Sequence, residues 1–79
     1  MHVLFYGKLA DSFGETVEMK LSKSCTIAEL RERLEEHVPA AKGALGGRVR
    51  ACVGDRIVED SHVVGPQDRV EFLAPVSGG

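Results

Sequence analysis

Residues 26–38 have the sequence TIAELRERLEEHV, the one long helical pattern in the chain. Thr26 and Glu29 have the capping-box spacing, in which each side chain accepts a hydrogen bond from the other's free backbone N–H at a helix start. The apolar residues recur at intervals of three and four: Ile27, Leu30, Leu34 and Val38. Pro39 cannot continue a helix, because it lacks an N–H and restricts the residue before it. The pattern predicts one amphipathic helix that ends before Pro39, with its Glu and Arg residues on solvated faces.

Five further segments have the apolar run or the apolar–polar alternation of β-strands. They are residues 2–7, 17–21, 49–53, 57–58 and 70–74. Turn or loop residues separate them at 11–15, 40–47, 54–55 and 65–68. The first run is almost wholly apolar, which is typical of a central strand with neighbours on both sides, and Leu45 is expected to pin the long loop to the core. The order predicts an α+β fold, a two-layer roll with a mixed sheet of four to five strands packed on one main helix.

Size and composition limit what the chain can do. Its 79 residues suffice for one domain, and 43% hydrophobic with 28% charged residues is ordinary for a globular protein. The net charge of −2 leaves no positive surplus for a nucleic-acid backbone. The longest apolar runs are four residues long, whereas a membrane span needs roughly 20. We therefore expect a small cytoplasmic protein without a secretory signal that binds neither nucleic acid nor membrane.

The interior offers few residues in a chemical pattern. Cys25 and Cys52 have no Cys or His neighbour at ligand spacing, so we interpret both as small buried apolar residues with reduced thiols. The histidines occur singly, and the interior glycines lack the Lys-Ser/Thr of a phosphate-binding loop. These residues are His2, His37 and His62, and Gly43, Gly46 and Gly47. We expect no metal site and no nucleotide site among them.

The final residues, Pro75-Val76-Ser77-Gly78-Gly79, form a different kind of feature. Four extended residues after Pro75 reach roughly 13 to 14 Å, far enough to enter another protein's active site. Glycines let a backbone pass through a narrow channel and leave a terminal carboxylate unhindered. A frayed end is the plain alternative, but the apolar Leu73, Pro75 and Val76 are not what a solvated tail needs. The prediction is a folded domain over residues 1–75 and an extended tail over residues 76–79.

Several segments carry a family resemblance. They are Val3-Leu4-Phe5-Tyr6 with Phe13-Gly14, Thr26-Ile27-Ala28-Glu29-Leu30-Arg31, and Asp68-Arg69-Val70-Glu71-Phe72 with Pro75-Val76-Ser77-Gly78-Gly79. In them the chain resembles the β-grasp, ubiquitin-like sulfur carriers, most of all the small subunits of molybdopterin synthase. It departs from that pattern at Ala10, where a basic residue is frequent, at Gly54, where Asn commonly precedes the turn, and at Ala74, where a first proline is usual. The resemblance implies a polar contact between a basic residue at this position and a partner, and Ala10 has no side-chain group to make it.

The resemblance implies a carrier with no catalytic side chains, metal or cofactor of its own. An adenylyltransferase similar to ubiquitin-activating enzymes would use ATP to adenylate the carboxylate of Gly79, and a sulfur donor would convert it to a thiocarboxylate. The tail residues Val76, Ser77 and Gly78 would then enter a pocket of the large, catalytic subunit of the synthase. Two carriers in succession would supply the dithiolene sulfurs of molybdopterin during molybdenum cofactor biosynthesis, within a heterotetramer of two small and two large subunits.

Strand alternation predicts where the domain meets these partners. If Phe5 and Phe72 face the helix, then Tyr6 and Leu73 face the opposite side of the sheet. The resemblance places the first and last strands side by side. Tyr6, Leu73 and Pro75 are therefore expected to form one exposed apolar patch, as interfaces on small domains often do.

Two other functions stay open. A thiamine-pathway sulfur carrier shares the roll and the terminal Gly-Gly, but it is usually shorter and lacks the Pro75-Val76 pair. A ubiquitin-like binding module would dock through the sheet face, and its tail would do no chemistry.

Overall fold

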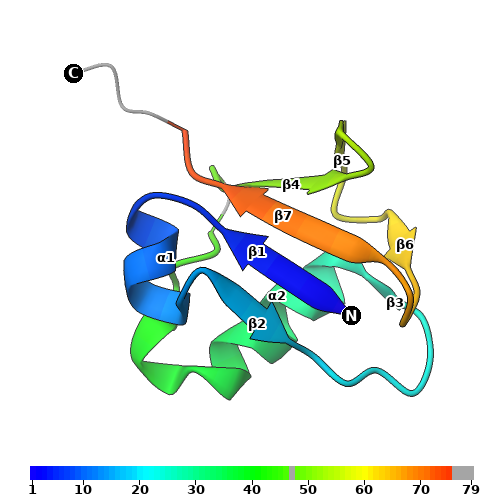
Figure 1. Cartoon of the computed structure of the whole chain (residues 1–79), viewed down its shortest axis with the longest axis horizontal. Helices are drawn as coiled ribbons and strands as arrows, with labels where there is room; N and C mark the ends of the chain where they lie inside the picture. The colour runs from blue at the N-terminus through cyan, green and yellow to red at the C-terminus, as the bar shows by residue number, and fades with distance from the viewer. Residues whose placement is uncertain (47, 76–79) are drawn as a thin grey trace.

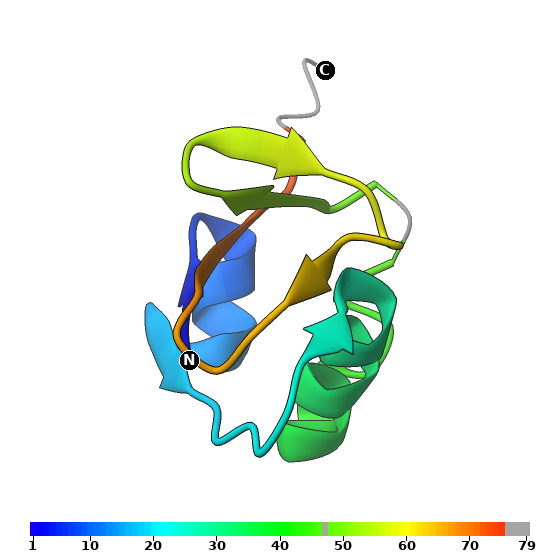
Figure 2. The ribbon, with the colours of Figure 1, turned by 90° about the vertical axis from the view of Figure 1, so that its right-hand side faces the viewer.

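The structure is a computed structural model that describes residues 1–46 and 48–75. Its strands are β1 (His2–Phe5), β2 (Thr16–Glu18), β3 (Cys25–Thr26), β4 (Arg50–Val53), β5 (Arg56–Val58), β6 (Val63–Val64) and β7 (Arg69–Leu73). Its helices are α1 (Lys8–Phe13), α2 (Ile27–His37) and the 3-10 helix η1 (Pro39–Ala41). Five strands form one sheet in the order β2-β1-β7-β4-β5, and β3 pairs separately with β6. Figures 1 and 2 show α2 on one side of the sheet, which confirms the α+β roll with one main helix.

The strands at the two ends of the sequence lie next to each other. β1 pairs with β2 in antiparallel fashion and with β7 in parallel fashion, and Phe5 is the Cα partner of Phe72. The prediction that the first strand has neighbours on both sides is confirmed. β7 also pairs with β4, so the last strand lies in the middle of the sheet.

Helix α2 begins as the capping-box spacing predicts. The backbone N–H of Glu29 donates to Oγ1 of Thr26 at 3.2 Å, and the backbone N–H of Thr26 donates to Oε1 of Glu29 at 2.8 Å. The second bond stabilises the carboxylate and holds the pKa of Glu29 below its usual value. The helix ends at His37, and Pro39 begins η1.

One core joins the helix to the sheet. Phe5 stacks on Phe72 with ring centroids 5.8 Å apart and on Phe13 at 4.5 Å. The helix covers these rings with side chains that are fully shielded from solvent: Ile27, Leu30 and Leu34. Leu45 is buried as predicted, so it fixes the loop after η1 to this core.

Helix α1 stands where the sequence predicts a turn at residues 11–15, and that prediction is wrong. Leu9 and Phe13, four positions apart, are both buried on the inner side of α1. Six residues are too few for a helical period to be recognised, and Asp11, Ser12 and Gly14 are typical turn residues. Packing of Phe13 on Phe5 therefore outweighs the local preference.

Other differences are small. β2 ends at Glu18, so the predicted alternation over residues 17–21 is only partly strand, and Met19 and Leu21 pack half-buried against the core. The two-residue pairing of β3 with β6 was not predicted, because so short a pair has no periodicity. The turn between β4 and β5 is confirmed, with positive φ of 56° at Gly54 and 66° at Asp55.

Two charged residues of α2 are not on a solvated face as predicted. Arg31, whose side chain is 14% exposed, donates to the carbonyls of Leu45 at 2.9 Å and Val49 at 2.7 Å. Glu35 accepts backbone N–H bonds from Gly43 at 2.9 Å and Leu45 at 3.0 Å. These bonds tie the loop to α2, because its backbone groups have no strand partner there.

Candidate functional site

The sheet face opposite α2 carries the predicted docking residues. Phe5 and Phe72 are buried partners beneath the helix, so the next residue of each parallel strand faces outward. Tyr6 is 44% exposed and Leu73 is 38% exposed. Pro75 is also exposed, two residues beyond Leu73. The structure thus brings Tyr6 and Leu73 to one side of the sheet.

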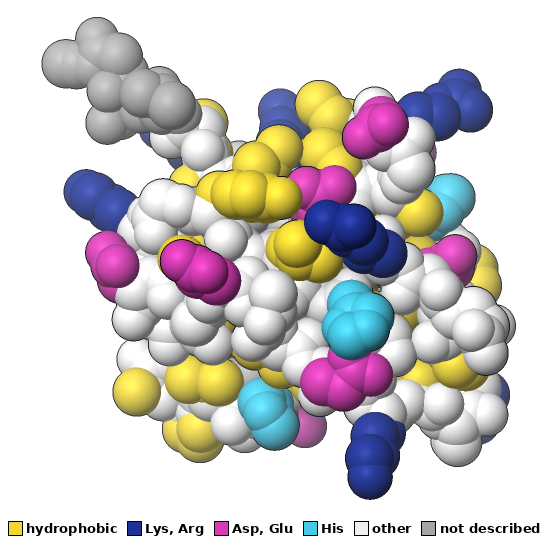
Figure 3. All heavy atoms as spheres, viewed as in Figure 1, with side chains coloured by type: hydrophobic (Ala, Val, Ile, Leu, Met, Phe, Trp, Pro, Cys, Tyr) yellow, Lys and Arg dark blue, Asp and Glu magenta, His cyan; other side chains and the backbone are white. Residues whose placement is uncertain are grey.

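The apolar surface extends further across the sheet than predicted. Successive Cα partners place Leu4, Glu71, Cys52 and Ile57 in one row across β1, β7, β4 and β5. Leu4 and Cys52 are half-buried, and Ile57 is 68% exposed. In Figure 3 apolar side chains gather over β1 and β7, with charged groups around them. We call the apolar members the sheet-face patch: Leu4, Tyr6, Cys52, Ile57 and Leu73.

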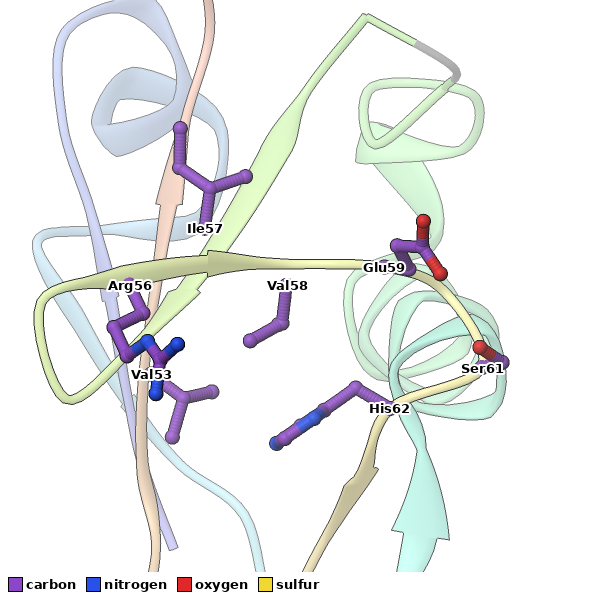
Figure 4. A pocket seen from close by; sticks show the side chains of 7 residues that line it. All are labelled: Val53, Arg56, Ile57, Val58, Glu59, Ser61 and His62. Carbon is purple, nitrogen blue, oxygen red and sulfur yellow. The ribbon is translucent and has the colours of Figure 1, made fainter.

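The neighbouring hollow shows which way β5 directs its side chains. A cavity of about 430 Å³ lies between β5 and the segment that leads to β6. Figure 4 shows Arg56 and Val58 on the side of β5 that faces His62, whereas Ile57 points to the other side. Ile57 therefore belongs to the outer face. The sequence contained this signal, since Ile57 alternates with Arg56 and Val58, but the predicted patch left it out.

A hydrogen bond organises the patch. The Tyr6 hydroxyl donates to Oε2 of Glu71 at 2.6 Å, across the β1–β7 pair. This bond, reinforced by the negative charge of Glu71, raises the pKa of the Tyr6 phenol above its usual value of 10.0. The phenol therefore stays a donor at neutral pH, and the one carboxylate in the row has a partner within the chain.

The cysteines differ in position. Cys25 is buried, as predicted, but Cys52 is only half-buried and lies within the sheet-face patch. Burial raises the pKa of both thiols, and Glu71 adds to the effect at Cys52. Both thiols are therefore weak nucleophiles at neutral pH, because the thiolate is the reactive form.

The predicted tail residues Val76, Ser77, Gly78 and Gly79 lie outside the described residues. The described chain ends at Pro75, beside the sheet-face patch. Among residues 1–46 and 48–75, no three His, Cys, Asp or Glu side chains are grouped as metal ligands. No helix in the same part of the chain has the length and apolar content to cross a bilayer.

A mixed sheet that grips one main helix, with the first and last strands parallel at its centre, defines the β-grasp, ubiquitin-like fold. The model of the ThiS family matches residues 3–79, so this chain belongs to the ThiS family of ubiquitin-like sulfur carriers. No curated protein sequence matches the chain.

Solved structures have the same fold at low sequence identity. SAMP1 from Haloferax volcanii is 19% identical with a TM-score of 0.84, over 99% of this chain and 97% of that one. A Pyrococcus furiosus protein provisionally named molybdopterin converting factor, subunit 1, is 19% identical with a TM-score of 0.81, over 95% of each chain. The thiamine biosynthesis protein ThiS from Geobacter metallireducens is 20% identical with a TM-score of 0.53, over 100% of each chain.

Proposed function

We propose that this protein is a sulfur carrier, the small subunit of a molybdopterin synthase, and that the carboxylate of Gly79 is its reacting group. The observation that carries the proposal is the sheet-face patch next to the start of the Gly-Gly tail, on a chain of the ThiS family. The patch gives the domain a surface for docking on a partner, and the tail would carry the Gly79 carboxylate into that partner's active site.

The chemistry follows from the poor reactivity of a carboxylate. An activating enzyme would join the Gly79 carboxylate to the AMP part of ATP and release pyrophosphate. Sulfide delivered by the sulfur donor would then attack the acyl carbon and displace AMP, which leaves a thiocarboxylate. That group is an effective sulfur nucleophile near neutral pH. Cys25 and Cys52 are poorly suited to carry the sulfur themselves, because their pKa values are raised.

The sheet-face patch would serve the two docking events that the cycle needs, first on the activating enzyme and then on the large synthase subunit. Tyr6 and Leu73 combine a broad apolar contact with an exposed position, as residues at interface centres do. Because one patch serves both partners, the complexes must be mutually exclusive, and each must release the carrier.

Molybdopterin is favoured over thiamine by the Pro75-Val76 pair, which the thiamine-pathway carriers usually lack. The name of the second Haloferax volcanii match, small archaeal modifier protein 1, suggests a further use of the same activated carboxylate, in which a protein amine would replace the sulfur nucleophile.

The test is reconstitution with partners from the same organism. We expect the chain to co-purify with the large synthase subunit and, after activation with ATP and a sulfur donor, to support molybdopterin formation. Deletion of Gly79 should leave the complex intact and abolish product. Sulfur transfer confined to the thiamine-pathway enzymes would contradict the molybdopterin assignment, and full function without Gly79 would contradict the carrier role itself.

A further inference from the structure

The outer face of β7 and the adjoining end of β4 carry charges of alternating sign. Arg69 and Glu71 are exposed or half-buried on this face, and Leu73 follows them at the same spacing of two. Arg50 is the cross-strand partner of Leu73 and is itself exposed. The order along the strand is therefore positive at Arg69, negative at Glu71 and positive at Arg50. The two arginines stand about 13 Å apart along the strand direction, at 3.3 Å per residue.

The three charged groups differ in the bonds that they make within the chain. Glu71 accepts the hydrogen bond from Tyr6 at 2.6 Å. The ion pairs of the described residues involve Glu18, with Met1 and His2, and Asp60, with Arg31. In the part of the chain that the structure describes, Arg50 and Arg69 thus have no ion-pair partner. Arg69 does interact with the Tyr6 phenol, where it lowers the pKa against the effect of Glu71. Both guanidinium groups still have N–H donors for a carboxylate of another molecule.

The surplus of acidic residues lies elsewhere. Helix α2, on the opposite side of the sheet, carries Glu29, Glu32, Glu35 and Glu36. The chain has a net charge of −2, yet Arg50 and Arg69 flank its apolar face. With acidic residues on the helix side and arginines on the sheet face, the domain would be oriented by a partner's electric field before contact.

We infer that the sheet-face patch selects protein partners whose apolar surface is flanked by two carboxylates, placed to meet Arg50 and Arg69, whose backbone positions are about 13 Å apart along the strand direction. The inference rests on the proposed function for the identity of the partners and goes beyond it in assigning the recognition residues. Arginine suits this role because its planar guanidinium binds a carboxylate through two parallel hydrogen bonds. Glu71, between the arginines, disfavours a third carboxylate at the centre, so the pattern also fixes the register of docking.

The experiment measures association of the full-length chain with the large synthase subunit of the same organism, across a series of salt concentrations. Arg50→Glu and Arg69→Glu are compared with Arg56→Glu. Arg56 is an exposed arginine on the same sheet, but Figure 4 shows it on the opposite side of β5 from Ile57. All three variants change the net charge equally, so a difference between them reports position and not total charge.

We expect each outer-face variant to lower the association rate by about tenfold at low salt and to flatten its salt dependence. Arg56→Glu should retain the wild-type rate to within about twofold. Arg50→Gln and Arg69→Gln remove the charge without reversing it. Each should lower the association rate less than the Glu substitution at the same position. Thermal unfolding of each variant establishes that it is folded.

Equal effects of all three Glu variants, no effect, or faster association of the outer-face variants would overturn the inference. In each of these cases wild-type binding and molybdopterin formation would leave the proposed function standing. If the wild-type chain did not bind the large subunit at any salt concentration, both the proposed function and this inference would fail.

Discussion

Leu73→Asp tests the docking role of the sheet-face patch without disturbing the core. Leu73 is 38% exposed on the outer face, and its neighbours in β7, Val70 and Phe72, provide the buried contacts. A carboxylate at this position lies in solvent in the free domain. It can also pair with Arg50 across the strands. We therefore expect the free energy of unfolding to change by no more than about 0.5 kcal/mol, the usual range for surface substitutions.

Binding should suffer far more than stability. Full burial of a leucine side chain contributes about 1.5–3 kcal/mol, so covering the 38% of Leu73 that is exposed contributes about 1 kcal/mol at most. Leu73→Ala should therefore weaken docking by roughly fivefold. A carboxylate in the same interface must also be desolvated, which costs several kcal/mol more. Leu73→Asp should lower affinity by about 3 kcal/mol, or roughly 100-fold.

The assay is calorimetric titration of each variant into the large synthase subunit, with urea unfolding measured in parallel. Val63→Asp is the matched control, because Val63 is 58% exposed on β6, outside the five-stranded sheet. It should bind as the wild type does. A folded Leu73→Asp variant with wild-type affinity would refute the assignment of this face, and equal losses in both variants would show that the effect is not local.

Three further predictions concern the contacts inside the domain. The raised pKa of Tyr6 means that the stability from its bond to Glu71 is present below pH 10 and is lost as pH rises through that pKa. Tyr6 is the one tyrosine, so its absorbance titration should move back towards 10.0 in Glu71→Ala, and an unmoved titration would contradict the bond. Thr26→Ala should lower the free energy of unfolding by about 1 kcal/mol and raise the pKa of Glu29 towards its usual value of 4.5, as followed by NMR; an unchanged pKa would exclude the capping box. Arg31→Ala should cost about 3 kcal/mol in urea unfolding, because two carbonyls lose a charged donor, and a cost below about 0.5 kcal/mol would show that solvent replaces it.

The sequence predicts the elements that have a clear period. Thr26 and Glu29 locate the start of α2, and the apolar spacing from Ile27 to Leu34 identifies its buried face. Alternation likewise places Tyr6 and Leu73 on the outer face, once β1 and β7 are known to be neighbours. The pairing of β1 with β7 was predicted from the family resemblance, because the alternation of apolar and polar residues within a strand does not specify its partner strands.

Long-range contacts explain what the sequence could not predict. α1 depends on Phe13 meeting Phe5, and the burial of Arg31 depends on a loop folding back over α2. Ile57 joins the sheet-face patch because the β4–β5 hairpin sets it opposite Cys52. In each case a local pattern was compatible with two environments, and packing of distant segments selected one.

The most direct test of the carrier account is the intact mass of the chain isolated from its native host. The account predicts a species that is heavier by the mass difference between sulfur and oxygen and that is labelled at Gly79 by a thiol-reactive reagent, which distinguishes a thiocarboxylate from simple oxidation. The species should be absent when the activating enzyme is removed. A chain that carries only an unmodified Gly79 carboxylate while molybdopterin synthesis proceeds would contradict the account.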